Sequence, residues 1–235
     1  MRRTPLVVAG LTLALLPSAT AAQLYDGPPL DAQEYLQFVG AGDAVVATWG
    51  GVYLGPYEGS FLTPTTPTFS LYCVDYTHHA TSQWVDVTQL SGVADFGSTR
   101  LGSFETYRHT AYLSSLFDSW QTLGDDKRTV WSGIHAAIWS LTNDQDLGSG
   151  ETLAVRDLLL TDPLHLVGAA SFETDGWYVI SPGTEPYGGR DGQEFLIRAQ
   201  STVPEPSTYL LMGTGLLLLA AFSQKRRLAP SVDEA

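Results

Sequence analysis

The chain ends in an apolar segment that is short for a permanent membrane anchor and too sharply bounded for a buried core helix. The apolar run covers residues 208–223 of 235. The motif Val203-Pro204-Glu205-Pro206 precedes it, and the basic cluster Lys225-Arg226-Arg227 follows it. A helix needs about 20 apolar residues to cross a bilayer core. Basic residues stay on the cytoplasmic side, so we expect the body of the chain outside the cytoplasm.

The other end has the three parts of a secretory signal peptide. Met1-Arg2-Arg3 is basic, residues 6–16 are apolar, and residues 17–22 supply the small side chains of a cleavage site. We predict that signal peptidase cuts between Ala22 and Gln23. The predicted organisation is a signal peptide at 1–22, an extracytoplasmic domain at 23–202 and a tail at 203–228 that contains a single transmembrane helix.

The order of motif, apolar run and basic cluster resembles the PEP-CTERM sorting tail of exported Gram-negative proteins. The resemblance implies that an exosortase, a membrane-embedded transpeptidase-like enzyme, recognises the tail. The chain would then cross the inner membrane, remain briefly as a single-pass membrane protein, and pass to the cell envelope or the extracellular space. The sequence leaves open whether the tail is cleaved or retained as an ordinary anchor.

The charge and the cysteine content of the body exclude several classes of protein. Five of the 12 basic residues and three of the 25 acidic residues lie in the two ends, so the body carries a net charge of −15. Such a surface repels nucleic acid, and we expect no nucleic-acid partner. Cys73 is the single cysteine. An intrachain disulfide is therefore impossible, although the chain is expected in an oxidising compartment.

Hydrophobic periodicity predicts an α+β fold, a β-rich domain with a two- or three-helix insert at about 105–160. The predicted helices cover 105–123, 127–141 and 152–160, with Asp125 or Asp126 as the cap of the second helix. Residues 57–62 are expected to pair back on the strand before them. The predicted strands cover 45–53, 57–62, 68–76, 83–90, 177–180 and 194–198.

Two short motifs within the body suggest a known relationship. Leu71-Tyr72-Cys73-Val74-Asp75 lies on a predicted strand, and Ile134-His135-Ala136-Ala137-Ile138-Trp139 lies on a predicted helix. Together with Tyr53-Leu54-Gly55-Pro56-Tyr57-Glu58-Gly59, Trp177-Tyr178-Val179-Ile180-Ser181-Pro182 and Gln193-Glu194-Phe195, they resemble a group of PEP-CTERM proteins. That group in turn looks like the thioester domains of bacterial surface adhesins.

In those adhesins, the resemblance implies, the strand cysteine is joined to a glutamine side chain in an internal thioester. A nucleophile on a host surface attacks this stored electrophile, and the adhesin becomes covalently attached. Cys73 takes the cysteine position here, and Ala137, Ile138 and Trp139 match the end of the helical motif. The glutamine position falls on His135, and an imidazole cannot form a thioester. The resemblance therefore implies the fold and a surface role without the crosslink.

Cys73 and His135 also allow a second interpretation, as a thiolate–imidazolium pair for a thiol-dependent hydrolase or transferase. Strand alternation would place Asp75 on the same face as Cys73, where its carboxylate could orient the imidazole. The sequence offers no evident oxyanion hole for such chemistry. The simplest interpretation is a buried thiol beside a packed histidine, and we predict no enzymatic activity.

Other candidate sites lack the spacing that their chemistry needs. His78 and His79 point to opposite strand faces, so either would need Asp75 or His109 to hold a metal, and no zinc-type spacing is present. Asp144-Gln145-Asp146 with Gly148 lacks the closing glutamate of a calcium loop. We predict no metal and no cofactor. Five tryptophans could form a glycan-stacking surface but are more typical of a core: Trp84, Trp120, Trp131, Trp139 and Trp177.

These observations together predict an exported cell-envelope or extracellular-matrix protein, such as a component of a biofilm matrix, with a structural or adhesive role. The expected partners are signal peptidase, an exosortase, and an exopolysaccharide or another surface ligand. The thiol-dependent enzyme and a glycan- or cation-binding module remain the alternatives. The sequence does not identify a ligand or an oligomeric state.

Overall fold

The computed structural model describes residues 23–26, 30, 32–46, 51–61, 67–91, 96–183, 191–199 and Thr214. The chain divides into two compact units, Met1–Ala199 and Gln200–Ala235. The predicted signal peptide, the sorting motif at 203–206, the basic cluster at 225–227 and the apolar run apart from Thr214 lie outside the described residues. Within the described part of the chain, no helix is long and apolar enough to cross a membrane.

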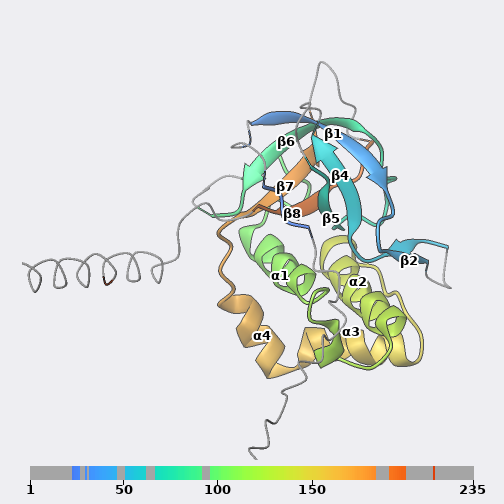
Figure 1. Cartoon of the computed structure of the whole chain (residues 1–235). Helices are drawn as coiled ribbons and strands as arrows, with labels where there is room; N and C mark the ends of the chain where they lie inside the picture. The colour runs from blue at the N-terminus through green and yellow to red at the C-terminus, as the bar shows by residue number, and fades with distance from the viewer. Residues whose placement is uncertain are drawn as a thin grey trace, which may run out of the picture. The chain divides into compact units, whose positions relative to one another are not determined.

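Six strands of the first unit close into a barrel in the order β1-β4-β5-β8-β7-β6, with every neighbouring pair antiparallel (Figure 1). Closure occurs where β1 pairs with β6, from Gln33 opposite Asp86 to Leu36 opposite Gln83. A closed barrel has no free strand edges to pair with another chain. The barrel strands are β1 Gln33–Gly40, β4 Tyr57–Phe61, β5 Phe69–Cys73, β6 Gln83–Gln89, β7 Trp177–Pro182 and β8 Phe195–Arg198.

Burial along the strands shows which faces of the barrel are covered. In β4, Tyr57, Gly59 and Phe61 are buried and alternate with partly exposed residues, as expected when one face is inside the barrel. All five residues of β5 are buried. The turn that follows α1 (Phe104–Ser115) covers the outer face of this strand, since Tyr72 stacks on Phe117 with ring centroids 6.0 Å apart. The prediction that β5 is a strand is confirmed, and its continuous apolar pattern reflects burial on both faces.

A small hairpin lies outside the barrel and corrects the prediction of one strand at 45–53. Two short strands, β2 Val45–Val46 and β3 Tyr53–Leu54, pair antiparallel with each other. The backbone of Gly51 has a φ of +68°, a turn conformation that glycine adopts without strain. The prediction that 57–62 pairs back on the preceding strand is also wrong, because β4 pairs with β1 and β5.

The helical insert connects β6 to β7, and Figure 1 shows its helices together on one side of the barrel. The prediction of two or three helices is wrong, because the described residues of the insert form four α-helices. The predicted helix at 105–123 ends early, and a 3-10 turn at Trp120–Thr122 follows it. Asp126 caps the second helix by accepting a hydrogen bond from Thr129 N at 2.8 Å. The α-helices are α1 Phe104–Ser115, α2 Lys127–Asn143, α3 Glu151–Thr161 and α4 Pro163–Ala170.

The unpredicted helix α4 is explained by its first residues and by its composition. Asp162 caps it by accepting from Leu164 N at 2.8 Å, and Pro163 occupies the first turn, where its missing N–H costs nothing. The helix is apolar on more than one side, since Leu164 is 82% and Val167 67% exposed. It therefore lacks the one-sided periodicity by which amphipathic helices are recognised.

The N-terminal described residues of the first unit pair with the residues at the C-terminal end of β8. Tyr25 forms a parallel bridge with Ala199, and its N–H donates to the carbonyl of Arg198 at 2.9 Å. Gln23, the predicted first mature residue, donates from its N–H to Ser70 Oγ at 3.0 Å and accepts from Ser70 N at 2.9 Å. The described residues of the first unit thus begin and end beside the barrel.

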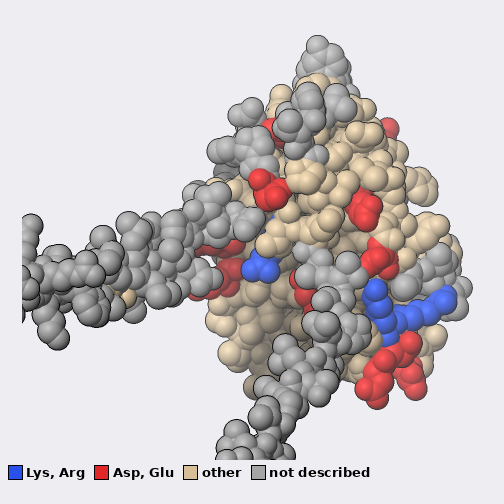
Figure 2. Space-filling view, viewed as in Figure 1, with Lys and Arg blue, Asp and Glu red and all other residues tan. Residues whose placement is uncertain are grey.

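The acidic residues of the body do not gather in one patch on the face seen in Figure 2, where they are spread among neutral residues. A scattered arrangement is typical of a solvated surface rather than of a cation-binding site. Among the described residues, no group of three or more histidine, cysteine, aspartate or glutamate side chains is placed to hold a metal ion.

Candidate functional site

The thiol of Cys73 lies at the end of β5 and is fully buried. Its Sγ donates to the backbone carbonyl of Asp75 at 3.3 Å. Burial is the largest influence on this group and raises the pKa of the thiol to about 12. The thiol is therefore protonated at neutral pH, and a protonated thiol is a poor nucleophile.

The imidazole of His135 is buried on the face of α2 that packs toward the barrel. Its Nδ1 accepts a hydrogen bond from the backbone N–H of Gly55 at 2.9 Å. One face of the ring stacks on Trp139, with centroids 4.6 Å apart and planes 6° from parallel, and Phe117 approaches edge-on at 5.0 Å. Burial lowers the pKa of His135 from 6.5 to about 3. The imidazole is therefore neutral, with its proton on Nε2.

Cys73 and His135 share Trp139 as a neighbour, because the indole both stacks on the imidazole and hydrogen-bonds to the thiol. Within the described part of the chain, no hydrogen bond joins the thiol to the imidazole. The two pKa shifts also oppose proton transfer between them, since burial favours the neutral form of each group. The arrangement is that of a packed core rather than of an activated nucleophile.

Asp75 does not orient His135 in this structure. Because β5 ends at Cys73, strand alternation no longer governs Asp75, and its carboxylate turns to a different set of partners. The carboxylate accepts from Thr77 N at 3.0 Å, and its oxygens lie 2.7 Å from His78 Nδ1 and 3.1 Å from an Arg100 guanidinium nitrogen. This cluster ties the segment after β5 to the segment before α1.

Gln193 is a buried residue that sequence analysis did not single out for a role. Its Nε2 donates to the Asp75 carbonyl at 2.6 Å, the same oxygen that accepts the Cys73 thiol. The Gln193 carbonyl in turn accepts from Gln83 Nε2 at 3.1 Å. The available sequence signal was the presence of a polar amide directly before the apolar strand β8.

Glu194 is a second buried group without a predicted role, and it is 1% exposed. Its carboxylate accepts from Ser181 Oγ at 2.6 Å, from Arg100 N at 3.1 Å and from the Tyr107 hydroxyl. Burial raises the pKa of this carboxyl, although the three hydrogen bonds lower it. The carboxylate thus holds the segment before α1 against the barrel.

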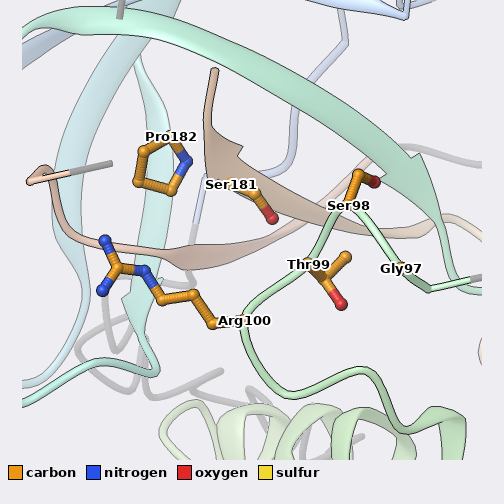
Figure 3. Close-up of a pocket in the computed structure, with 6 residues that line it drawn as sticks. All are labelled: Gly97, Ser98, Thr99, Arg100, Ser181 and Pro182. Carbon is orange, nitrogen blue, oxygen red and sulfur yellow. The ribbon is translucent and has the colours of Figure 1, made fainter. Parts of the chain in front are cut away.

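A polar cavity of about 290 Å³ lies beside Glu194. In Figure 3, Ser181 and Pro182 of β7 face the segment 97–100, and the Arg100 side chain extends toward Pro182. The Arg100 guanidinium also donates to the carbonyl of Gly192 at 2.5 Å. Because Ser181 and Arg100 already bind protein groups, the cavity offers few groups for a ligand.

A larger cavity of about 480 Å³ opens where the β2–β3 hairpin, the barrel and α2 meet. Its volume lies within the range of about 300–1000 Å³ that small-molecule sites occupy. Trp139 lines it, so this cavity borders the Cys73 and His135 centre. The described residues that line it are Phe38, Ala41, Gly51, Val52, Tyr53, Tyr57, Tyr76, His78, His79, Ala80, Trp139 and Gln193.

The remaining residues that sequence analysis considered for metal, calcium or glycan binding lie in ordinary structural positions. Asp144 has a left-handed backbone with φ 52° and ends α2, and Asp146 forms an ion pair with Arg156. His79 is exposed, and His78 contacts Asp75. Three of the five tryptophans proposed as a stacking surface are buried, at 5% exposure or less: Trp131, Trp139 and Trp177.

Comparison with known proteins identifies the tail. Residues 202–227 match the model of the PEP-CTERM protein-sorting motif. The prediction of this motif is confirmed, and the motif is characteristic of exported proteins that an exosortase processes after C-terminal anchoring in the membrane. No curated protein matches the chain.

Solved structures similar to this one are of the group that the body was expected to resemble. The N-terminal thioester domain of a surface protein from Clostridium perfringens has 8% identity and a TM-score of 0.40, covering 70% of this chain and 97% of that one. The N-terminal thioester domain of fibronectin-binding protein SfbI from Streptococcus pyogenes has 11% identity and a TM-score of 0.42, covering 77% and 100%. The corresponding domain of a protein F2-like fibronectin-binding protein from Streptococcus pneumoniae has 9% identity and a TM-score of 0.43, with the same coverage.

Proposed function

We propose that this chain is an exported protein of the cell envelope or extracellular matrix, whose body acts as a structural or adhesive domain after an exosortase has processed the tail. The observation that carries the proposal is the sorting motif at 202–227. A net negative body with a closed barrel suits life outside the cytoplasm, because the charge keeps it soluble and the barrel itself has no free strand edge.

The adhesion that we propose is non-covalent. A crosslink through Cys73 would need a thiolate or a glutamine partner, whereas the thiol is protonated and its neighbour on α2 is a neutral imidazole. The same two shifts disfavour the thiol-dependent hydrolase or transferase. Intact mass of the purified protein tests this point, because an internal thioester would lower the mass by one molecule of ammonia, and methylamine treatment would reverse the loss.

Sorting is tested by replacing Pro204-Glu205-Pro206 with three alanines in cells that express the chain. We expect the variant to remain unprocessed in the membrane fraction, whereas the unaltered chain is shortened and leaves that fraction. The body offers a matched control in a second Glu-Pro pair, Glu185-Pro186, whose replacement by two alanines should leave processing unchanged. If the tail variant is shortened and released like the unaltered chain, the sorting role is wrong.

The adhesive role needs a separate measurement. Cells that lack the protein should attach less to surfaces or to the extracellular matrix, and the Cys73→Ala variant should restore attachment fully. Attachment that depends on the thiol would contradict the non-covalent role. Attachment that does not change when the protein is removed would contradict adhesion itself while leaving sorting intact.

A further inference from the structure

The cavity of about 480 Å³ beside the β2–β3 hairpin has the lining of a small-molecule site. The structural or adhesive role proposed above assigns no ligand to it. Its described walls come from six parts of the chain: β1, the β2–β3 hairpin, β4, the segment after β5, α2, and the segment before β8. Sites of this kind combine apolar and aromatic walls with a few polar groups that fix the orientation of a ligand.

Aromatic rings dominate the walls. Tyr76 lies against Trp139 with ring centroids 4.9 Å apart, and Phe38 meets Tyr57 edge-to-face at 5.8 Å. Tyr53 is 48% exposed at the edge of the same cavity. These contacts support the rings in fixed positions, and such pre-organisation reduces the entropy lost when a ligand binds.

The polar groups of the cavity are one amide and two imidazoles. Gln193 is 6% exposed, and its Nε2 is held by the Asp75 carbonyl at 2.6 Å, which leaves the amide oxygen as the atom available to a ligand. The imidazole of His79 adds nitrogen atoms at the rim, whereas the ring nitrogens of His78 already contact Asp75 and Arg100. No carboxylate, lysine or arginine is among the described residues that line the cavity.

We infer that this cavity binds one neutral sugar unit of a glycan. A sugar ring presents C–H faces, which suit contact with aromatic rings, and hydroxyl groups, which donate to the fixed amide oxygen of Gln193 and bond to the imidazole of His79. A purely apolar ligand would cover that amide oxygen and leave it without a partner, which is unfavourable. An anionic ligand would meet a body with a net charge of −15 and no lining cation.

The inference deepens the proposed adhesive role, because it names the class of surface to which the domain would bind. It rests on that role for where the protein meets its ligand. Binding itself is a property of the folded body. A test with purified protein therefore separates the two proposals, since loss of sorting in cells leaves binding in solution unchanged, and absence of binding leaves sorting unchanged.

The test titrates the purified full chain with neutral trisaccharides of glucose, galactose, mannose and N-acetylglucosamine, followed by calorimetry and by NMR of the sugar signals. We expect saturable binding of at least one of them. Tyr53→Ala should weaken that binding by about tenfold, the scale of one aromatic contact. Because Tyr53 is half exposed, this variant is expected to fold, and its unfolding midpoint verifies that it does.

Two further variants distinguish contact with the sugar from general disturbance. Tyr35→Ala removes a partly exposed tyrosine that packs on Trp84 outside the cavity, and binding should be unchanged. Tyr76→Phe keeps the ring and should bind more tightly than Tyr76→Ala. The inference is overturned if none of the four sugars binds saturably, if Tyr53→Ala binds as the unaltered chain does, or if tetramethylammonium or glucuronate binds where the neutral sugars do not.

Discussion

Protonation of His135 is expected to destabilise the domain as the pH falls below neutrality. Its Nδ1 already accepts the Gly55 N–H at 2.9 Å, and the rings of Phe117 and Trp139 pack on the imidazole. A proton on Nδ1 would break that hydrogen bond and place a charge among aromatic side chains. The lowering of the His135 pKa from 6.5 to about 3 expresses the same penalty.

The sign and size of the effect follow from proton linkage. Because the pKa is lower in the folded state, the unfolded chain binds more protons between pH 6.5 and about 3. The stability contributed by the neutral imidazole is therefore present above pH 6.5 and lost as the pH falls through this window. One pKa unit corresponds to about 1.4 kcal/mol, so the loss is about 2 kcal/mol at pH 5. Domains are typically stable by about 5–15 kcal/mol, so the effect is measurable.

Urea unfolding, followed by tryptophan fluorescence at pH 7, 6, 5 and 4, measures this loss. His135→Asn removes the titrating group, cannot restore the glutamine of a thioester, and keeps a side-chain oxygen in the position of Nδ1 that can accept the Gly55 N–H. We expect the stability difference between the unaltered chain and this variant to change by about 1.4 kcal/mol per pH unit below 6.5. His79→Asn is the matched control, because His79 is exposed, and it should keep the slope of the unaltered chain. Parallel curves for the unaltered chain and His135→Asn would refute the reasoning.

Three further predictions concern the same core. Cys73, with its pKa raised to about 12, should resist thiol reagents in the native protein and react fully in denaturant; rapid native labelling would contradict its burial. Tyr107→Phe removes a donor to the buried Glu194 carboxylate and should lower the free energy of unfolding by about 1–3 kcal/mol, whereas unchanged urea unfolding would mean that the contact is weak. Gly55→Ala should lower the free energy of unfolding by about 1–3 kcal/mol more than Gly51→Ala in the same assay. Both glycines have positive φ, but only at Gly55 would an added Cβ meet an indole ring. Equal losses of stability would show that the backbone conformation alone matters.

The elements that sequence analysis identified are those with a strong local signal. The helix α2 has a capping aspartate followed by apolar residues at helical spacing, and the strand β5 combines aromatic and apolar residues between polar loops. The sorting motif was also recognisable, because its order of proline-bounded motif, apolar run and basic cluster is specific. The pairing partners of the strands were not accessible, since β4 pairs with two strands that are not its predicted partner.

The surroundings of the candidate site could not be predicted because they form between distant segments. Glu194 binds Arg100 and Tyr107, which are 94 and 87 residues away in sequence. The direction of the Asp75 carboxylate depends on where β5 ends, and the alternating pattern does not mark that end. The burial that keeps Cys73 and His135 neutral likewise arises from packing of α2 on the barrel.

The strand β8 has a mechanical consequence for a chain that is held by its C-terminal side. It lies between β5 and β7 and pairs antiparallel with both, and Tyr25 adds a further hydrogen bond at Arg198. A pull on the chain beyond Ala199 is therefore carried by rows of hydrogen bonds on both sides of β8, which are loaded together in shear. Peeling an edge strand would break such bonds one at a time. The closed barrel thus places a strand that is paired on both sides next to the point where tension would enter the domain.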